Sequence, residues 1–430
     1  MERLMQYVWQ HRLWPATPSL STVDGRPVRI IYPGRLNTDA GPDFFNARIL
    51  IDGHLWAGDV EIHVKASDWY RHGHHTDPAY SSVILHVVDF DDAAVTRPDG
   101  TTIDQMRLPC SPDFRAHYDT LVATAARSLP CAARISAIEP LHLTAWTQAL
   151  AYERLYERAD RIAALHHTLS SDWESVSYVT LARALGFGIN GDCFERLAIA
   201  TPLSILGHHA DNLLSVEALL FGQSGLLEAA PSTDPYVDSL RREYRFMAHK
   251  FGLRPMSAPA WKMARMRPAG FPHRRIALLA AIIHSGARIH SRLLEASSPA
   301  DVDTILSASL SGYWEHHYHL SDPYHELTPQ ALSRASLSTL AINVAATIKF
   351  AYGHITDSAD QRRQAIELLE ALPPEANRLT APFTDAGLPC RDALTSQGLI
   401  QLRRAYCEAH RCLHCRIGHR HLSAHALRHT

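Results

Sequence analysis

The chain has 430 residues, and its 42 basic and 44 acidic side chains give a formal net charge of −2. This near balance excludes a chain-wide polyelectrolyte, so a nucleic-acid partner has to be bound by a local patch. An apolar content of 46% excludes disorder as the main state, and the length allows two or three domains. The sequence shows neither a run of about 18 apolar residues nor a signal peptide, so we expect a cytoplasmic protein with no membrane partner.

The N-terminal part alternates short strand-like runs with turn residues such as Asp52-Gly53 and Pro98-Asp99-Gly100. The predicted strands cover residues 27–32, 47–51, 59–65 and 82–88. This pattern predicts a β-rich domain with a mixed sheet over residues 1–135.

From about residue 140 onward, apolar residues recur at helical spacing. The predicted helices cover residues 143–165, 173–185, 215–227, 236–251, 274–294, 331–352, 358–372 and 396–409. Because no fixed-period repeat is present, we expect a compact all-α domain over residues 136–430. The predicted fold class is therefore α+β, with a larger helical domain that ends in a cysteine cluster at residues 390–418.

Four ionisable residues alternate along the third predicted strand: Asp59, Glu61, His63 and Lys65. They share one face because strand side chains alternate. In one interpretation this is the solvent-facing side of an antiparallel sheet. In the other it is a metal-dependent phosphodiesterase site, in which Asp43 and Glu61 bind Mg²⁺ or Mn²⁺ and His63 or Lys65 orients water or steadies the phosphate.

Asp43 follows the turn residues Gly41-Pro42, and Glu61 lies on a neighbouring predicted strand. This arrangement resembles the PD-(D/E)XK nuclease superfamily, whose pattern has an acidic residue and a lysine two positions apart on that strand. Here His63 occupies the lysine position, and the lysine comes at Lys65. The resemblance implies a restriction-endonuclease-like sheet and a metal-dependent nuclease.

A histidine-rich segment follows the same strand. As zinc ligands, His63, His72, His74 and His86 would form a rival hydrolase site with an imidazole-rich set of ligands. A histidine-rich loop that hydrogen-bonds to the sheet edge, or that contacts substrate phosphate, is the alternative.

Three cysteines lie close together near the C-terminus. Cys412 and Cys415 have the C-x-x-C spacing with which two thiolates share one tetrahedral ion, and Cys407 precedes them. Buried thiols on a helix are the alternative. A closed site needs a fourth ligand, for which the candidates are Cys131, Cys390, His410 and His414. Zinc is the expected metal, and an iron–sulfur cluster is the alternative.

Residues 261–275 are basic and contain two large aromatic side chains, Trp261 and Phe271. Cations for phosphate and rings for base stacking are typical of a surface that binds single-stranded nucleic acid. The cations are Lys262, Arg265, Arg267, Arg274 and Arg275. An arginine-rich loop paired with acidic neighbours has the same composition.

Several segments together resemble a bacterial family known as domain of unknown function 2851, over nearly the whole chain. They include Gly41-Pro42-Asp43-Phe44, Val60-Glu61-Ile62-His63, Ser67-Asp68-Trp69, His72-Gly73-His74, Glu153-Arg154-Leu155, Glu217 to Gly222, Trp261-Lys262 and Tyr406 to Gly418. The family has no assigned activity. Its pattern contains a cysteine like Cys131 but none like Cys390, which favours Cys131 as the fourth ligand.

Three functional hypotheses follow. The first is a metal-dependent nuclease-like protein that acts on or binds nucleic-acid phosphodiesters. The second is a non-catalytic nucleic-acid-binding or scaffold protein on a degenerate nuclease fold, which the displaced Lys65 and the near-neutral charge suggest. The third is a zinc hydrolase that uses the histidines from His63 to His86.

Overall fold

The structure is a computed structural model that describes residues 1–14, 19–37, 39–110, 112, 115–116, 118–119, 129, 131–230, 234–264, 266–286, 288–320 and 326–420. The chain divides into two compact units. Unit 1 consists of Met1–Trp146, Ala381–Leu388 and Leu402–Thr430, and unit 2 of Thr147–Thr380 and Pro389–Gln401. Both units are therefore discontinuous in sequence.

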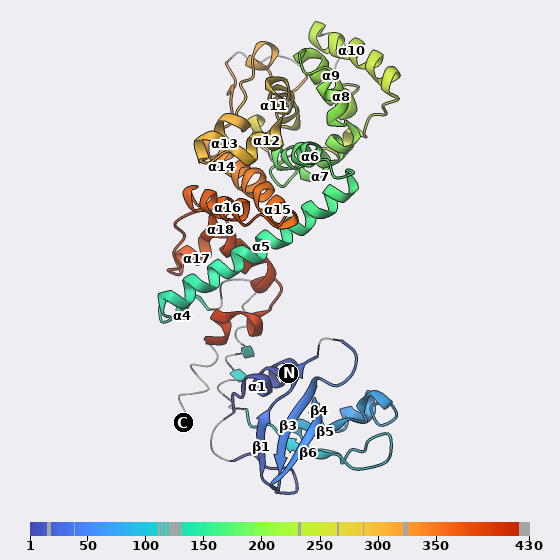
Figure 1. Cartoon of the computed structure of the whole chain (residues 1–430), viewed down its shortest axis with the longest axis vertical. Helices are drawn as coiled ribbons and strands as arrows, with labels where there is room; N and C mark the ends of the chain where they lie inside the picture. Colours follow the sequence, from blue (N-terminus) through green and yellow to red (C-terminus); the bar gives the residue numbers. More distant parts are fainter. Residues whose placement is uncertain are drawn as a thin grey trace. The chain divides into compact units, whose positions relative to one another are not determined.

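Unit 1 contains a mixed β-sheet (Figure 1). Its strands are β1 (Val28–Tyr32), β2 (Arg35–Leu36), β3 (Phe44–Ile51), β4 (His54–Lys65), β5 (Val83–Phe90) and β6 (Asp104–Arg107). The order is β1-β3-β4-β5-β6, with β2 paired to β3. The pairs of β1, β2 and β4 with β3 are antiparallel, whereas β5 is parallel to β4 and to β6. The predicted N-terminal mixed sheet is confirmed.

The β3–β4 hairpin closes at the predicted turn, where Asp52 and Gly53 both have positive φ angles, 49° and 79°. Two positive φ angles are typical of the type I′ turn, which suits the twist of an antiparallel pair. At its other end the hairpin has a bulge at Asn46, with φ 58°. The Asn46 amide donates to Asp59 Oδ1 at 2.9 Å, and Ser82 Oγ donates to Asp59 Oδ2 at 2.5 Å. Asp59 therefore holds the bulge.

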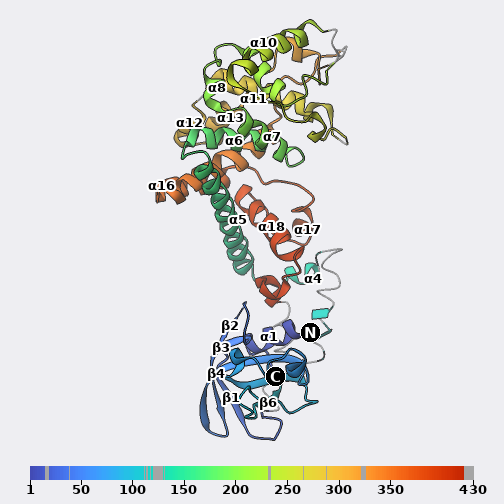
Figure 2. The same cartoon turned by 90° about the vertical axis from the view of Figure 1, so that its right-hand side faces the viewer.

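One side of the sheet is covered by helix α1 (Glu2–His11), which lies beside the strands in Figure 2. Its apolar side chains share one core with Val60 and Ile62 of β4. Trp9 of α1 is fully buried, and its indole N–H donates to Pro33 O at 2.9 Å. The apolar residues Val60 and Ile62 thus face one core, as the alternation along the strand predicts.

The other side of β4 is covered by the segment that leads to β5. A parallel pair needs such a crossover connection, and here it contains α2 (Asp68–Arg71) and η1 (Pro78–Tyr80). Trp69 and Tyr80 from this segment pack with Val83 of β5 in a second small core. Glu61 and His63 are only 5% and 1% exposed, so this is not the solvent-facing side of a sheet.

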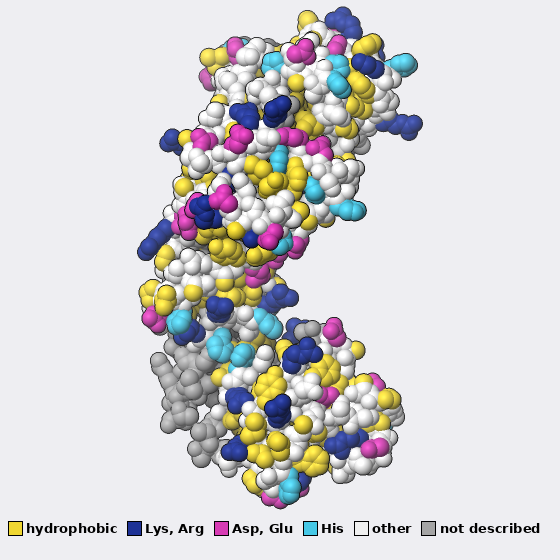
Figure 3. Space-filling view, viewed as in Figure 1, with side chains coloured by type: hydrophobic (Ala, Val, Ile, Leu, Met, Phe, Trp, Pro, Cys, Tyr) yellow, Lys and Arg dark blue, Asp and Glu magenta, His cyan; other side chains and the backbone are white. Residues whose placement is uncertain are grey.

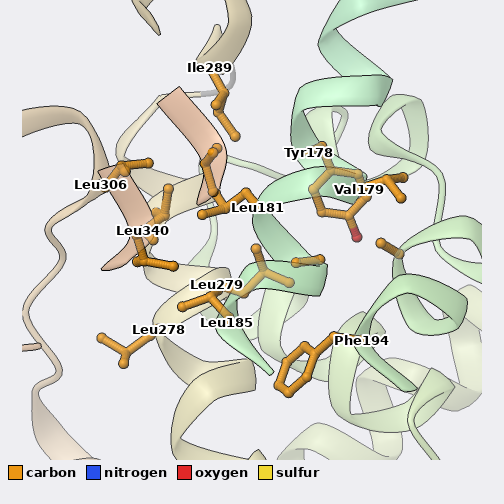
Figure 4. Packing of buried hydrophobic residues seen from close by; sticks show 14 of the residues in the cluster. Tyr178, Val179, Leu181, Leu185, Phe194, Leu278, Leu279, Ile289, Leu306 and Leu340 are labelled. Atoms are coloured by element: carbon orange, nitrogen blue, oxygen red, sulfur yellow. The ribbon is translucent and has the colours of Figure 1, made fainter. Parts of the chain in front are cut away.

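Unit 2 is helical, and its core is shown in Figure 4. Tyr178 and Leu181 from α6, Phe194 from α7, Leu279 from α11 and Leu306 from α13 pack together there. Its helices are the greater part of α5 (Pro140–Thr168), α6 (Trp173–Leu185), α7 (Gly191–Ala200), α8 (Leu203–Gly207), α9 (Leu213–Gln223), α10 (Pro235–Phe251), α11 (Pro272–Ser285), α12 (Ile289–Glu295), α13 (Pro299–Leu306), α14 (Arg334–Leu340), α15 (Thr347–Ile355), α16 (Ala359–Ala371) and α18 (Ala393–Gln401).

The α+β class is confirmed, with an N-terminal mixed sheet and a larger helical region. The described residues of 136–146, 381–388 and 402–420 belong to unit 1, although the predicted limits assign them to the helical domain. The limits 1–135 and 136–430 stay a prediction. Among the described helices, none combines the length and the apolar character needed to cross a bilayer.

Candidate metal site

Asp43 is placed by a loop that Asn37 holds together. The Asn37 side-chain amide donates to Pro42 O at 3.0 Å, and the Asn37 backbone amide donates to Asp43 O at 2.7 Å. The carboxylate of Asp43 then accepts hydrogen bonds from Gln6 Nε2 at 2.8 Å and from the Ile62 amide at 3.0 Å. These bonds fix Asp43 between α1 and β4.

Glu61 lies next to Asp43 on β4. Its Oε2 accepts a hydrogen bond from the Asp43 amide at 2.9 Å. Its Oε1 lies 3.4 Å from both His63 Nε2 and His74 Nε2. One carboxylate therefore joins the start of β3 to two imidazoles.

Three histidines lie close together, and two of them, His63 and His74, face Glu61. Ligand atoms of His63, His72 and His74 all lie within 4.8 Å of one another, and His63 Nε2 is 3.1 Å from His72 Nδ1. On the far side of its ring, His63 Nδ1 lies 2.9 Å from His86 Nε2, on β5. We call Glu61, His63, His72 and His74 the β4 cluster.

The crossover segment positions two of these histidines, His72 and His74. Gly73 has φ 79°, a left-handed conformation that lets the chain reverse after α2. The His74 amide then donates to Trp69 O at 3.1 Å, and the His74 ring stacks on Tyr80 at 3.8 Å between centroids. His74 Nε2 is buried without a hydrogen-bond partner, whereas His72 is exposed, so the cluster is open to solvent at His72.

Burial and charge perturb the groups in and around the cluster. Burial, followed by the charge of Glu61, raises the pKa of Asp43 to about 7, and burial raises the pKa of Glu61 to about 8. Burial also lowers the pKa of His63 to about 2 and that of His86 to about 3. The imidazoles of His63 and His86 are therefore neutral, the form that can offer a lone pair to a metal.

Two spacings in the cluster match those of a tetrahedral metal site. Four ligands about 2.1 Å from a tetrahedral ion lie about 3.4 Å apart, and Glu61 Oε1 is 3.4 Å from two imidazole nitrogens. Three imidazoles and one carboxylate suit zinc or iron better than Mg²⁺, which prefers oxygen ligands. His86 holds the outer nitrogen of His63, as residues behind metal ligands commonly do.

Lys65 lies apart from these acidic residues. It is exposed at the end of β4, and its charge lowers the pKa of Asp92, after hydrogen bonds from Ser67. Within the described part of the chain, no hydrogen bond or ion pair joins Lys65 to Asp43 or Glu61. Lys65 lies two strand positions beyond the lysine position of the PD-(D/E)XK pattern, a distance of about 7 Å along the strand. This distance accounts for the lack of contact with Asp43 and Glu61.

The basic stretch of unit 2 is only partly on the surface. Lys262 and Arg267 are exposed, and Arg265 lies outside the described residues. Arg274 is only 2% exposed, and its guanidinium donates to the carbonyls of Trp314 at 2.7 Å and His317 at 2.9 Å. Arg274 is thus a core residue that does not face the solvent, a correction to the expected contact surface.

Arg275 is half-buried, with its guanidinium over the ring of Phe187 at 4.5 Å. Burial lowers its pKa to about 10. On the face shown in Figure 3, acidic and basic side chains are interspersed over the helices, without a large area of one sign. The nucleic-acid surface on unit 2 stays a prediction that rests on Lys262 and Arg267.

The structure brings Cys131, Cys407, Cys412 and Cys415 together in unit 1, where their thiols interact electrostatically. Cys390 belongs to unit 2 and interacts instead with Asp392.

The geometry defines a candidate metal site in a mixed α+β protein. The chain belongs to the family described as protein of unknown function DUF2851, which matches residues 2–378. The matched part contains the β4 cluster and Cys131 and ends before Cys407. Neither a curated protein nor a solved structure matches the chain.

Gln6 and Tyr80 contact the site, but the sequence analysis did not predict either contact. The signal for α1 was present, because Leu4, Met5, Val8 and Trp9 have helical spacing. Neither residue has a local pattern that predicts its contact with Asp43 or His74.

Proposed function

We propose that this protein is a metal-dependent hydrolase of the nuclease type, which cleaves phosphodiester bonds with a metal ion bound at the β4 cluster. The observation that carries the proposal is the convergence of Glu61 Oε1 with His63 Nε2 and His74 Nε2 at 3.4 Å, with His72 adjoining. These ligands come from β4 and from the crossover segment. The proposal joins the nuclease hypothesis with the zinc ligands of the third hypothesis.

Glu61, His63, His72 and His74 bind the ion in this proposal. An ion in that position would supply Lewis acidity and a bound water of lowered pKa. His72 is the exposed ligand, so the substrate enters on its side. Mg²⁺ or Mn²⁺ at Asp43 and Glu61 is the less favoured arrangement, because both oxygens of Asp43 already accept hydrogen bonds.

Asp43 is the proton acceptor in this proposal. Its pKa of about 7 lies near the range in which a general base works at neutral pH. The bonds from Gln6 and Ile62 orient its carboxylate beside Glu61. Lys65, exposed on the same strand, binds a phosphate oxygen of the substrate.

Two features support a nucleic acid as substrate. Asp43 precedes β3 and Glu61 lies on the antiparallel neighbour β4, as in the PD-(D/E)XK pattern. Arg29, Arg35 and Arg48 are exposed on β1, β2 and β3, in the same unit as the β4 cluster. Exposed arginines on one sheet suit the backbone of a polyanion.

The test is cleavage of labelled DNA and RNA oligonucleotides by the full chain, after chelation and addition of Zn²⁺, Mn²⁺ or Mg²⁺. We expect cleavage with Zn²⁺ or Mn²⁺ that falls by at least about 100-fold in Glu61→Gln and His74→Asn. His54→Asn is the matched control, because His54 is an exposed histidine of β4 outside the cluster. Equal cleavage by wild type and both cluster variants would refute the assignment.

The position of Lys65 favours a second candidate, a non-catalytic nucleic-acid-binding or scaffold protein on a degenerate nuclease fold. This candidate predicts salt-sensitive binding without cleavage under every metal condition. Binding would then survive Asp43→Ala and weaken in Arg29→Ala and Arg48→Ala.

A further inference from the structure

Four cysteines from distant parts of the sequence meet in unit 1. Cys131 precedes α4 (Ala132–Ile135), Cys407 ends η6 (Leu402–Cys407), and Cys412 and Cys415 bracket η7 (Cys412–His414). The raised pKa values of Cys131, Cys407 and Cys412 have burial as their first cause and the charges of others of these thiols as a further cause, as expected of thiols that are neighbours in space. Cys131 and Cys415 are 284 residues apart in the sequence, so the fold and not the local chain brings these thiols into one unit.

The other cysteines have different partners. Cys193 donates to Ala260 O at 3.1 Å. Cys110 interacts with Arg115 and Asp89, and Cys390 with Asp392. Of the two cysteine candidates for the fourth ligand, Cys131 is the one whose charge acts on the pKa of Cys407, after burial and Cys415.

The chain around the C-terminal cysteines is shaped for close approach. The Cys415 amide donates to Cys412 O at 3.3 Å and closes a tight turn. A side chain at Gly418 would place its Cβ 2.2 Å from Cys412 O, so a glycine is required there. Cys407 ends a π-helical turn, a distortion found frequently at functional sites.

The surroundings of Cys415 suit a bound thiolate. The amides of Gly418 and Ile417 hydrogen-bond to its sulfur, and hydrogen bonds to the sulfurs are a usual feature of metal–thiolate centres.

We infer that Cys131, Cys407, Cys412 and Cys415 bind one metal centre through four thiolates, and that this centre holds the C-terminal segment of unit 1 in place. Soft metals select such a ligand set, either as one zinc ion or as an iron–sulfur cluster. The inference is independent of the proposed hydrolase.

The spacing of the sulfurs bears on the kind of centre. Around one zinc ion, with bonds of about 2.3 Å, four sulfurs lie about 3.8 Å apart. Among the described residues, no three of these sulfurs lie within 4.8 Å of one another. A zinc ion would therefore draw the thiolates together, whereas a cluster, whose irons lie between the thiolates, holds them farther apart.

The segment held by the centre also packs on the N-terminal part of unit 1. Leu413 contacts the core that includes α1, and the Tyr7 hydroxyl hydrogen-bonds to His419. The rings of Trp146 and Tyr406 pack edge-on, with 5.4 Å between their centroids, and the Arg416 guanidinium lies over the Trp146 ring. Loss of the centre should therefore loosen unit 1 as a whole.

The test measures zinc, iron and acid-labile sulfide per chain in protein purified without oxygen. We expect either one zinc ion or iron with matching sulfide, bound at these cysteines and lost in Cys131→Ser and Cys407→Ser. Cys390→Ser and Cys193→Ser are the matched controls and should keep the metal. Glu61→Gln should also keep it, which separates this centre from the β4 cluster.

A second measurement needs no variant that could fail to fold. Cobalt added to chelated wild-type protein should give the intense absorption of thiolate-to-cobalt charge transfer, with four thiols then protected from alkylation. Wild-type protein without zinc or iron and without the cobalt absorption would overturn the inference. Metal retained at full content in Cys131→Ser would overturn the assignment of the fourth ligand.

Discussion

Glu61 is the residue on which the candidate site depends, because its two oxygens serve different parts of unit 1. One oxygen accepts from the Asp43 amide at the start of β3, and the other faces the imidazoles of His63 and His74. A glutamine in its place would keep the shape but lose the charge. The ligand set and the position of Asp43 therefore both depend on one carboxylate.

The raised pKa values of the carboxyl groups make the metal-free protein sensitive to pH. The pKa is about 7 for folded Asp43 and about 8 for folded Glu61, whereas unfolded carboxyl groups titrate near pH 4. The folded chain holds these protons to higher pH, so this contribution to stability is complete below about pH 4 and is lost as the pH rises to 8. The pKa values of His63 and His86 are lowered in the folded chain. Their contribution to stability is therefore complete above about pH 6.5 and is lost as the pH falls below that value.

Of these four groups, the two carboxyl groups are the ones that titrate between about pH 6.5 and 8. We expect the free energy of unfolding of chelated protein to fall over this range, by up to about 1.4 kcal/mol per pH unit for each proton released. Urea unfolding at several pH values measures the change. Glu61→Gln and Asp43→Asn should each flatten the dependence, and a fall of wild-type size in both variants would contradict the assigned pKa shifts.

At the scale of elements, the β3–β4 hairpin and its contact with β5 set the register that brings Glu61 to the histidines. Gly58 of β4 lies close to the chain at the start of β5. A Cβ on Gly58 would lie 2.4 Å from Ile84 Cγ2 and 2.6 Å from Ser82 O. The second of these atoms is backbone, so β5 itself would have to move.

We expect Gly58→Ala to destabilise the protein by about 1–3 kcal/mol and to weaken metal binding at the β4 cluster. The matched variant is Asn46→Gly, because the left-handed conformation of Asn46 suits glycine and should leave stability within about 1 kcal/mol of wild type. Thermal unfolding compares the two. Gly58→Ala with wild-type stability would show that the hairpin tolerates a shift of β5.

Alternation of polar and apolar residues was enough to predict four strands and the buried side of β4. It could not predict what covers the other side of β4, because the crossover segment is placed by long-range pairing of β4 with β5. The same limit applies to Arg274, since composition does not distinguish a buried arginine from an exposed one. The convergence of His63, His72 and His74 was likewise only one of several predicted arrangements.

At the scale of the whole molecule, the candidate chemistry belongs to unit 1. The β4 cluster and the four cysteines both lie in it, although its residues come from both ends of the chain. Unit 2 contributes a large helical core and the exposed Lys262 and Arg267. The family match covers residues 2–378 and extends through most of unit 2, so the family sequence includes both the sheet of unit 1 and the helices of unit 2.

The most direct test of the account is calorimetric titration of the chelated full chain with zinc at pH 7, in wild type, His74→Asn and His54→Asn. The account predicts a site in wild type and His54→Asn that is absent or weakened by at least about 100-fold in His74→Asn. Glu61→Gln should lose the same site. Equal zinc affinity and stoichiometry in wild type, His74→Asn and Glu61→Gln would contradict the central claim, that Glu61 and the three histidines form a metal site.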